Sequence, residues 1–216
     1  MAKTVTAAEM KERERAANEA GLLYIQMMEN AGRAAYAELK RRVPALRRLL
    51  IVAGKGNNGG DGFVMARVAA KEGVQVRVLL AEGEPKTADA KTNLARLAET
   101  AAEVVRDTEQ AAFGADAVVD ALYGTGFHGE LRPGGAAACA LMGRERERGA
   151  FVLALDLPSG VCADGGEVAE GAVQADATVT FDCTKPLHFA KASKPLCGAL
   201  VCADIGIGKA LGEHET

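Results

Sequence analysis

Residues 49–62 read Leu-Leu-Ile-Val-Ala-Gly-Lys-Gly-Asn-Asn-Gly-Gly-Asp-Gly, an apolar run followed by a glycine-rich loop. The run at 49–53 shows no alternation of apolar and polar residues, which predicts a strand buried on both faces of a parallel sheet. The loop matches the pattern G-x-G-x-x-G. We expect a helix over residues 62–71, capped at its start by Asp61 and ended by Gly73. The stretch is therefore a strand–loop–helix unit of an α/β fold.

The same alternation extends outward in both directions. Residues 7–42 are rich in Ala, Glu, Arg, Leu and Met, and predict two helices broken near Gly21. Further strands are expected at 74–80, 104–105, 117–120, 151–156, 177–181 and 199–202, with helices at 87–100 and 135–148. The pattern predicts a three-layer α/β/α sandwich with a mostly parallel central sheet and N-terminal helices. We expect one domain over residues 1–216, with a frayed tail from residue 209.

Composition restricts the class of protein. A net charge of −3 and a pI of about 5.7 argue against general nucleic-acid binding, which favours a basic surface. The N-terminus carries no apolar signal-peptide core, and no apolar stretch reaches membrane-spanning length. The five cysteines contain no C-x-x-C pair and are typical of reduced thiols. We therefore expect a cytoplasmic protein with neither nucleic acid nor membrane as partner.

Three predicted strands end in unusually polar loops. They are GKGNNGGDG from Gly54, DALYGTGFHGE from Asp120 and DLPSG from Asp156. Because ligands of open α/β sheets bind at the carboxyl ends of the strands, we expect these loops to form one site.

The chemistry of the first loop allows more than one ligand. If Asp61 caps the following helix, its carboxylate takes the amides and the positive dipole end that a dinucleotide pyrophosphate uses. The acidic residue expected about 20 positions after the glycines is also poorly matched, because Glu82 lies later. Asn58, Asp120 and Ser159 instead offer oxygen ligands from three loops, which hard cations prefer. Spacing alone does not identify the ion.

The chain resembles the YjeF N-terminal family, the NAD(P)H-hydrate epimerases. The resemblance rests on TAAEM, MMENAG, GKGNNGGDGFVMAR, DALYGTGFHGE, DLPSGVCADGGE, ADATVTF and GALVCADIGI, which occur in family order over nearly the whole chain. It implies a Rossmann-like fold, a homodimer, and epimerisation of the hydrated cofactors NADHX and NADPHX between their R and S forms. It also implies functional coupling to an ADP- or ATP-dependent dehydratase that uses the S epimer.

The resemblance further implies the residues of the site. A potassium ion would be bound by Asn58, Asp120 and Ser159, and Asp156 would face the reacting ring. The expected substrate-binding residues are Asn57, Asn58, Gly59, Gly60, Asp61, Gly124, Thr125, Gly126, Phe127, His128, Gly129, Glu130 and Asp156.

Asp156 is the candidate catalytic residue. The hydrate is a carbinolamine, whose hydroxide leaves when a group donates a proton, and a carboxyl group can give and later take that proton. Such an acid needs a pKa raised by burial or a neighbouring charge, and as an anion it would stabilise the iminium intermediate. The structural alternative for Asp156 and for Ser159 is a role in the turn at Pro158-Ser159-Gly160.

Other polar residues have two interpretations each. Lys185 follows a strand directly, so it either contacts substrate phosphates or lies in a solvated loop. His128 either touches substrate or is exposed, and Cys162 is expected to be a small buried hydrophobe. Glu14 stands where many family members carry Asp, a departure expected not to affect Asp156 or the ion ligands.

Two other functions remain open at this point. G-x-G-x-x-G on a strand–helix turn is typical of nicotinamide-dependent oxidoreductases. A non-catalytic nucleotide- or protein-binding module is the second, although the asparagines, Asp120 and Asp156 are all present, which favours catalysis.

Overall fold

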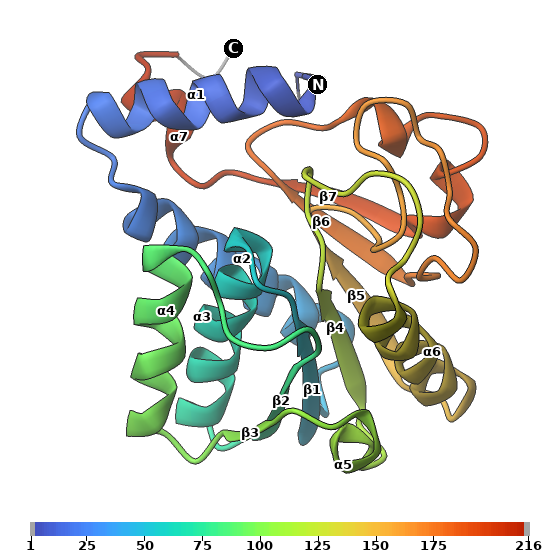
Figure 1. Ribbon diagram of the computed structural model, residues 1–216. Helices are drawn as coiled ribbons and strands as arrows, with labels where there is room; N and C mark the ends of the chain where they lie inside the picture. The colour runs from blue at the N-terminus through green and yellow to red at the C-terminus, as the bar shows by residue number, and fades with distance from the viewer. Residues whose placement is uncertain (1–2, 214–216) are drawn as a thin grey trace.

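All strands of the central sheet run parallel. The computed structural model describes residues 3–213, which form a three-layer α/β/α sandwich (Figure 1). The strands are β1 (Arg48–Ala53), β2 (Gln75–Leu80), β3 (Glu103–Val105), β4 (Ala117–Ala121), β5 (Phe151–Leu155), β6 (Ala177–Phe181) and β7 (Ala199–Ala203), in the spatial order β3-β2-β1-β4-β5-β6-β7. The predicted parallel sheet is confirmed.

The helices cover both faces of this sheet. They are α1 (Ala7–Glu19), α2 (Tyr24–Arg42), α3 (Asn57–Lys71), α4 (Ala88–Ala95), α5 (Thr108–Ala111), α6 (Pro133–Glu147) and α7 (Ile207–Ala210), with 3-10 turns η1 (Arg96–Glu99), η2 (Pro186–His188) and η3 (Lys194–Leu196). Alternate residues of β1 enter different cores: Leu49 and Ile51 join the core beneath α2 and α3, whereas Leu50 and Val52 join the core beneath α6. This double burial explains why the strand is apolar throughout. Within residues 3–213, no helix combines the length and apolar character that crossing a membrane requires.

The glycine-rich loop is shorter than predicted, because α3 begins at Asn57 with Gly56 as its N-cap. The prediction that Asp61 caps this helix is wrong, since Asp61 lies inside it. Glycines make the early start possible: a Cβ on Gly59 would lie 2.2 Å from the Gly54 carbonyl oxygen, and one on Gly62 would lie 2.7 Å from the Ala121 Cβ. Only glycine allows the helix to begin so close to the strand ends.

The two ends of the described chain lie together on one side of the sandwich (Figure 1). α1 packs against α7, and Arg13 of α1 binds both Asp182 and Glu213. The expectation of a frayed tail from residue 209 is therefore wrong up to residue 213, because this ion-pair network holds the segment on α1. His214, also expected in the tail, lies outside the described residues.

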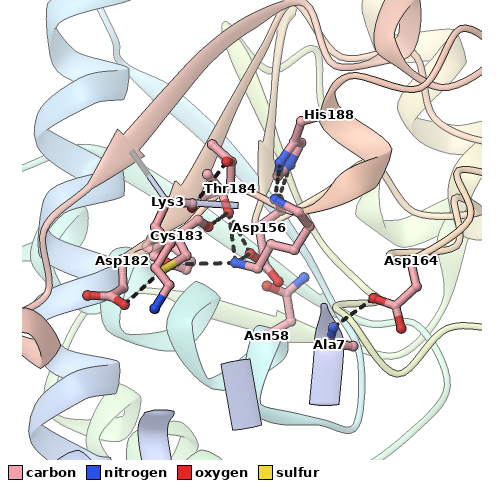
Figure 2. Close-up of polar contacts among 12 residues, drawn as sticks. Lys3, Ala7, Asn58, Asp156, Asp164, Asp182, Cys183, Thr184 and His188 are labelled. Carbon is pink, nitrogen blue, oxygen red and sulfur yellow. Dashed lines mark hydrogen bonds and ion pairs between the residues drawn. The ribbon is translucent and has the colours of Figure 1, made fainter. Parts of the chain in front are cut away.

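The start of the described chain is bound to the loops after β5 and β6. Thr4 forms a parallel bridge with Thr184, and the amide of Ala7 donates to Asp164 at 2.7 Å. These contacts hold α1 across the carboxyl ends of the strands, and Figure 2 shows the one between Ala7 and Asp164.

The order of the strands reverses between β1 and β4. β1 continues into α3 on one face of the sheet, whereas β4 leads to α6 on the other face. The loops after these two strands diverge at this point, which is where open α/β sheets bind their ligands.

Candidate functional site

Side chains connect the three polar loops around Tyr123. The amide nitrogen of Asn58 donates to the Tyr123 carbonyl at 2.8 Å, and the Tyr123 amide donates to the Ser159 hydroxyl at 3.0 Å. The Ser159 hydroxyl in turn donates to Asp120 at 2.6 Å. The structure thus brings together the three residues predicted to bind a cation.

Asp120 is a buried carboxylate with neutral partners. Its oxygens accept from the Ser159 hydroxyl, from the Ser159 amide at 2.7 Å and from the Leu122 amide at 3.2 Å. Among residues 3–213, no lysine, arginine or histidine pairs with it. Burial raises the pKa of Asp120 to about 6, although the hydrogen bonds from Ser159 and Leu122 act in the opposite direction. Its negative charge is therefore poorly compensated by protein groups.

A cavity of about 630 Å³ opens between the loops after β1, β2 and β4, and we call it the basic cavity. Its charged lining includes Lys55, Lys86 and Arg132. Glu82 also lines it, but its carboxylate accepts the Tyr123 hydroxyl at 2.8 Å and lies 3.8 Å from Arg132. Glu130 is the second acidic residue of the lining, so three positive side chains stand against two negative ones. The uncharged lining residues are Gly56, Asn57, Asn58, Thr87, Leu122, Tyr123, Gly124, Thr125, Gly126, Phe127 and His128. The positive side chains suit an anionic ligand.

The start of α3 strengthens this preference. Gly56 has no side chain with which to cap the helix, and the first turn carries no acidic residue. The amides at the start of the helix, which lack carbonyl partners inside it, therefore lie at the cavity wall with the positive end of the helix dipole. Because Asp61 does not occupy them, the sequence-based argument against a phosphate ligand no longer holds.

Two of the expected substrate-binding glycines instead serve packing. Gly59 and Gly60 are buried and line neither this cavity nor the acidic cavity described below. A Cβ on Gly60 would lie 2.5 Å from the sulfur of Met28 in α2. Their contribution is to bring α3 close to β1 and α2.

A smaller cavity of about 130 Å³ continues from the basic cavity, and we call it the acidic cavity. The two share Asn57, Asn58, Gly124 and Thr125. The remaining lining residues of the acidic cavity are Met10, Glu14, Asp61, Asp156, Phe181 and Lys185. The site therefore has two joined compartments of opposite charge.

Asp156 lies in the acidic cavity as half of an ion pair. The Lys185 ammonium approaches its Oδ1 at 2.6 Å, and the Thr180 hydroxyl lies 2.9 Å from the same oxygen. The other oxygen, Oδ2, lies on the side of Gly124 and Asn58, and Figure 2 shows the side chains of Asn58 and Asp156 next to each other. Within the described part of the chain no hydrogen bond reaches Oδ2, so Asp156 presents this carboxylate oxygen to the cavity.

Lys185 occupies neither of the positions considered from the sequence. Its side chain is 1% exposed, so it is not in a solvated loop, and it does not line the basic cavity. It donates to Asp156, to Thr180 at 2.9 Å and to the Phe181 carbonyl at 3.4 Å. Its position directly after a strand was the only sequence signal of this role.

The backbone at Asp156 is held in an uncommon conformation. Its φ is +65°, in the left-handed region that aspartate tolerates better than most residues. His188 supports the turn: its Nδ1 accepts from the Lys185 amide at 2.9 Å, and its Nε2 lies 3.0 Å from the Asp156 carbonyl oxygen. Burial lowers the pKa of His188, which favours the neutral ring that this pattern requires.

Two further carboxyl groups line the acidic cavity. Glu14 comes from α1 and Asp61 from α3, and burial raises the pKa of each. Asp156 raises both pKa values further, and Glu14 also raises that of Asp61, which lies well above its ordinary range. The expectation that Glu14 has no bearing on Asp156 is therefore wrong, because the fold places α1 over the site.

The loop 124–130 also separates the basic cavity from a third cavity of about 930 Å³. Phe127 and Glu130 line both, whereas Gly129 lines only the third. Cys162 lies there with its sulfur 3.5 Å from Nδ1 of His128. Cys162 is partly exposed, which corrects the expectation that it is buried.

Known proteins share this arrangement of the chain. The family described as YjeF-related protein N-terminus matches residues 24–187. The NAD(P)H-hydrate epimerase of Pirellula staleyi is 40% identical over 207 residues, covering 90% of this chain and 88% of the relative. The bifunctional NAD(P)H-hydrate repair enzyme Nnr of Coxiella burnetii is 36% identical over 202 residues, which are 93% of this chain and 41% of that enzyme.

A solved structure agrees on the fold. The crystal structure of the yeast protein ynu0 superposes with a TM-score of 0.76 at 20% identity, covering 94% of this chain and 88% of that one. This chain spans about two fifths of the length of the bifunctional relatives. The family match over residues 24–187 and the identity to the Pirellula staleyi protein lead to one conclusion: the chain belongs to the family of YjeF-related protein N-termini.

Proposed function

We propose that this chain is an NAD(P)H-hydrate epimerase, which interconverts the R and S forms of hydrated NADH and NADPH. The name of the Pirellula staleyi relative, most of whose length the chain covers, supports this activity. The structural observation that carries the proposal is the pair of joined cavities of opposite charge. They match a substrate with phosphates at one end and a ring that becomes cationic at the other.

The basic cavity would hold the phosphate groups. Lys55, Lys86 and Arg132 supply positive side chains, and the open amides at the start of α3 supply hydrogen-bond donors. The charge of Glu82 is directed toward Tyr123 and Arg132. The cavity thus favours an anion more strongly than its sequence pattern suggested.

The acidic cavity would hold the hydrated ring. Loss of hydroxide from the carbon beside the ring nitrogen leaves an iminium cation, which water attacks on either face. The free Oδ2 of Asp156 would face this positive charge, and a preorganised carboxylate in a site of low dielectric stabilises it strongly. Asp156 is accordingly the proposed catalytic residue, acting as an anion.

The residues around Asp120 fit a monovalent cation such as potassium. Asp120 is a buried carboxylate that pairs with no cationic side chain of residues 3–213, and Asn58 and Ser159 add neutral oxygens. A bound cation would compensate the charge of Asp120. The protein's own contribution is the hydrogen-bond chain through Tyr123, which connects the three loops.

The bifunctional relatives support a place for this activity beside a dehydratase. Their name, bifunctional NAD(P)H-hydrate repair enzyme, supports an epimerisation that serves repair of the hydrated cofactor. We propose that the S epimer formed here passes to a dehydratase, and that the protein acts as a cytoplasmic homodimer.

The function is tested by the rate at which R-NADPHX is converted to the S epimer in potassium buffer. Chromatography measures the two epimers. Wild type should accelerate the conversion, and Asp156→Asn should lower kcat by roughly 100-fold or more because the anion is lost. Asp204→Asn, an exposed residue that lines neither cavity, is the matched control. Equal, accelerated rates in wild type and Asp156→Asn would support the epimerase activity and show that Asp156 is not a catalytic residue. No acceleration by wild type would favour the non-catalytic binding module.

A further inference from the structure

Asp156 is poorly suited to donate the proton that releases the hydroxide. Its Oδ1 is 2.6 Å from the Lys185 ammonium and 2.9 Å from the Thr180 hydroxyl. Because Oδ1 accepts from both donors, this oxygen carries no proton of its own to give. The reaction therefore needs a proton from another group in the acidic cavity.

Asp61 and Glu14 are the remaining carboxyl groups of that cavity. They belong to α3 and α1 and enter it from two separate elements. Among residues 3–213, no hydrogen bond or ion pair reaches either carboxyl group, so neither is committed to a structural contact. Asp61 also lines the small adjoining cavity with Glu14, Tyr24 and Asp89. Both side chains are partly buried.

The charges around this pair favour a proton held on Asp61, whose pKa is the more strongly raised of the two. Asp61 faces the carboxyl groups of Asp156 and Glu14, and Lys185 is the cation on its side of the cavity. Glu14 faces Asp156 and Asp182, with Lys185 and Lys11 as opposing cations. Lys185 is already bound to Asp156, so burial and the neighbouring carboxylates prevail and raise the pKa of Asp61 and of Glu14. Carboxyl groups that share a site repel one another when ionised, so each makes it easier for a neighbour to keep its proton.

We propose that Asp61 is the proton donor and acceptor of the epimerisation, that Glu14 is the positioning residue which keeps Asp61 protonated, and that Asp156 acts only as the carboxylate. The assignment rests on the proposed function. It adds Glu14 of α1 to the machinery, and gives Asp61 a chemical role in place of the cap predicted from the sequence.

The step balances in atoms and electrons. Asp61 passes its proton to the hydroxyl oxygen, and the C–O bond breaks with both electrons leaving on water. The lone pair of the ring nitrogen forms the C=N bond of the iminium. Water then adds to the other face, the C=N pair returns to nitrogen, and the proton of that water passes to the Asp61 carboxylate. The cycle oxidises and reduces nothing.

The test compares kcat and KM for R-NADPHX epimerisation across a range of pH, after subtraction of the uncatalysed rate. Asp61→Asn should lower kcat by roughly 100-fold or more, the usual size of a general acid's effect, with KM within about threefold of wild type. Asp89→Asn removes a carboxyl group from the adjoining cavity but not from the acidic cavity, so it should retain wild-type kcat. Matching thermal unfolding would exclude misfolding as the cause.

Glu14→Gln supplies a readout that a structural role would not give. Removing its negative charge lowers the affinity of Asp61 for its proton, so activity should decline at lower pH than in wild type, with the maximal rate retained within about threefold. Glu14→Asp should restore the wild-type profile. Either an active Asp61→Asn or an unmoved profile in Glu14→Gln would overturn the assignment while leaving the epimerase intact. A wild type without activity would overturn the proposed function and this assignment together.

Discussion

The ammonium of Lys185 lies 2.6 Å from the carboxylate of Asp156, and the two side chains are 1% and 14% exposed. Lys185 also donates to Thr180 and to the Phe181 carbonyl, which uses all three of its protons. The pair is therefore a buried, hydrogen-bonded ion pair at the centre of the candidate site. Removing either partner of such a pair leaves the other charge buried and unpaired, which destabilises the folded protein.

Replacing Lys185 by methionine should destabilise the protein strongly. The change leaves Asp156 without its cation, and breaking a buried pair at one partner costs about 3–5 kcal/mol. Urea unfolding of Lys185→Met against wild type measures this loss. The double variant with Asp156→Asn should recover part of it, because the unpaired charge is then also removed. If the two single effects added within about 0.5 kcal/mol, the pair would not be energetically coupled.

His188 should make stability depend on pH. Its folded pKa lies below the ordinary 6.5, so the folded state binds fewer protons than the unfolded state as the pH falls. The stabilisation is thus present above about pH 6.5 and is lost as the pH falls through the folded pKa. The free energy of unfolding of wild type minus that of His188→Asn should decrease on acidification from pH 7.5. A difference that stays constant with pH would contradict this, and taking the difference removes the opposing contributions of Asp61 and Glu14.

The basic cavity should act on substrate binding rather than on the chemical step. Lys86→Ala and Arg132→Ala should each raise KM up to about fivefold, since an exposed charge contributes up to about 1 kcal/mol, and kcat should stay near wild type. The effect should shrink in high salt. Lys191→Ala, an exposed lysine that lines neither the basic, the acidic nor the third cavity, is the control. A loss confined to kcat would place the phosphates elsewhere.

Gly124 should control the passage between the two compartments. A Cβ there would lie 3.4 Å from the Asn58 Cβ and 4.0 Å from Asp156 Oδ2, ordinary contacts that the backbone accepts. Gly124→Ala should therefore fold with a free energy of unfolding within about 1 kcal/mol of wild type, yet lose activity at least about tenfold by obstructing the ring. Gly143→Ala, at an open helical position, controls for the substitution itself. Full activity in Gly124→Ala would show that the ring does not lie against this residue.

Potassium should stabilise the folded protein through Asp120. A cation at a concentration one hundred times its Kd adds about 2.7 kcal/mol to the free energy of unfolding. In a chain of this size, each kcal/mol raises Tm by roughly 2–4 °C. Thermal unfolding in potassium chloride, against tetramethylammonium chloride at equal ionic strength, measures the effect. Asp120→Asn should abolish it. The same potassium-dependent rise in Asp120→Asn would place the cation elsewhere.

Much of the fold could be predicted from local patterns. The apolar run of β1 predicted a buried parallel strand, because a strand covered on both faces has no polar side. The start of α3 could not be predicted in this way. The helix begins at Asn57 because Gly59 fits against Gly54 and Gly62 fits against Ala121. Such close approaches are tertiary contacts. Propensity and capping preferences favoured the later start, and packing outweighed them.

The amino-acid sequence by itself determined the order of elements, the three polar loops at the carboxyl ends of the strands, and the resemblance to a family. Those features depend on neighbours along the chain. Only the tertiary structure decided that Lys185, 29 residues from Asp156, neutralises it, and that Glu14 of the first helix reaches the same cavity as Asp61. The protonation of a carboxyl group depends on burial and on charges a few ångströms away, and these are set by folding rather than by sequence spacing.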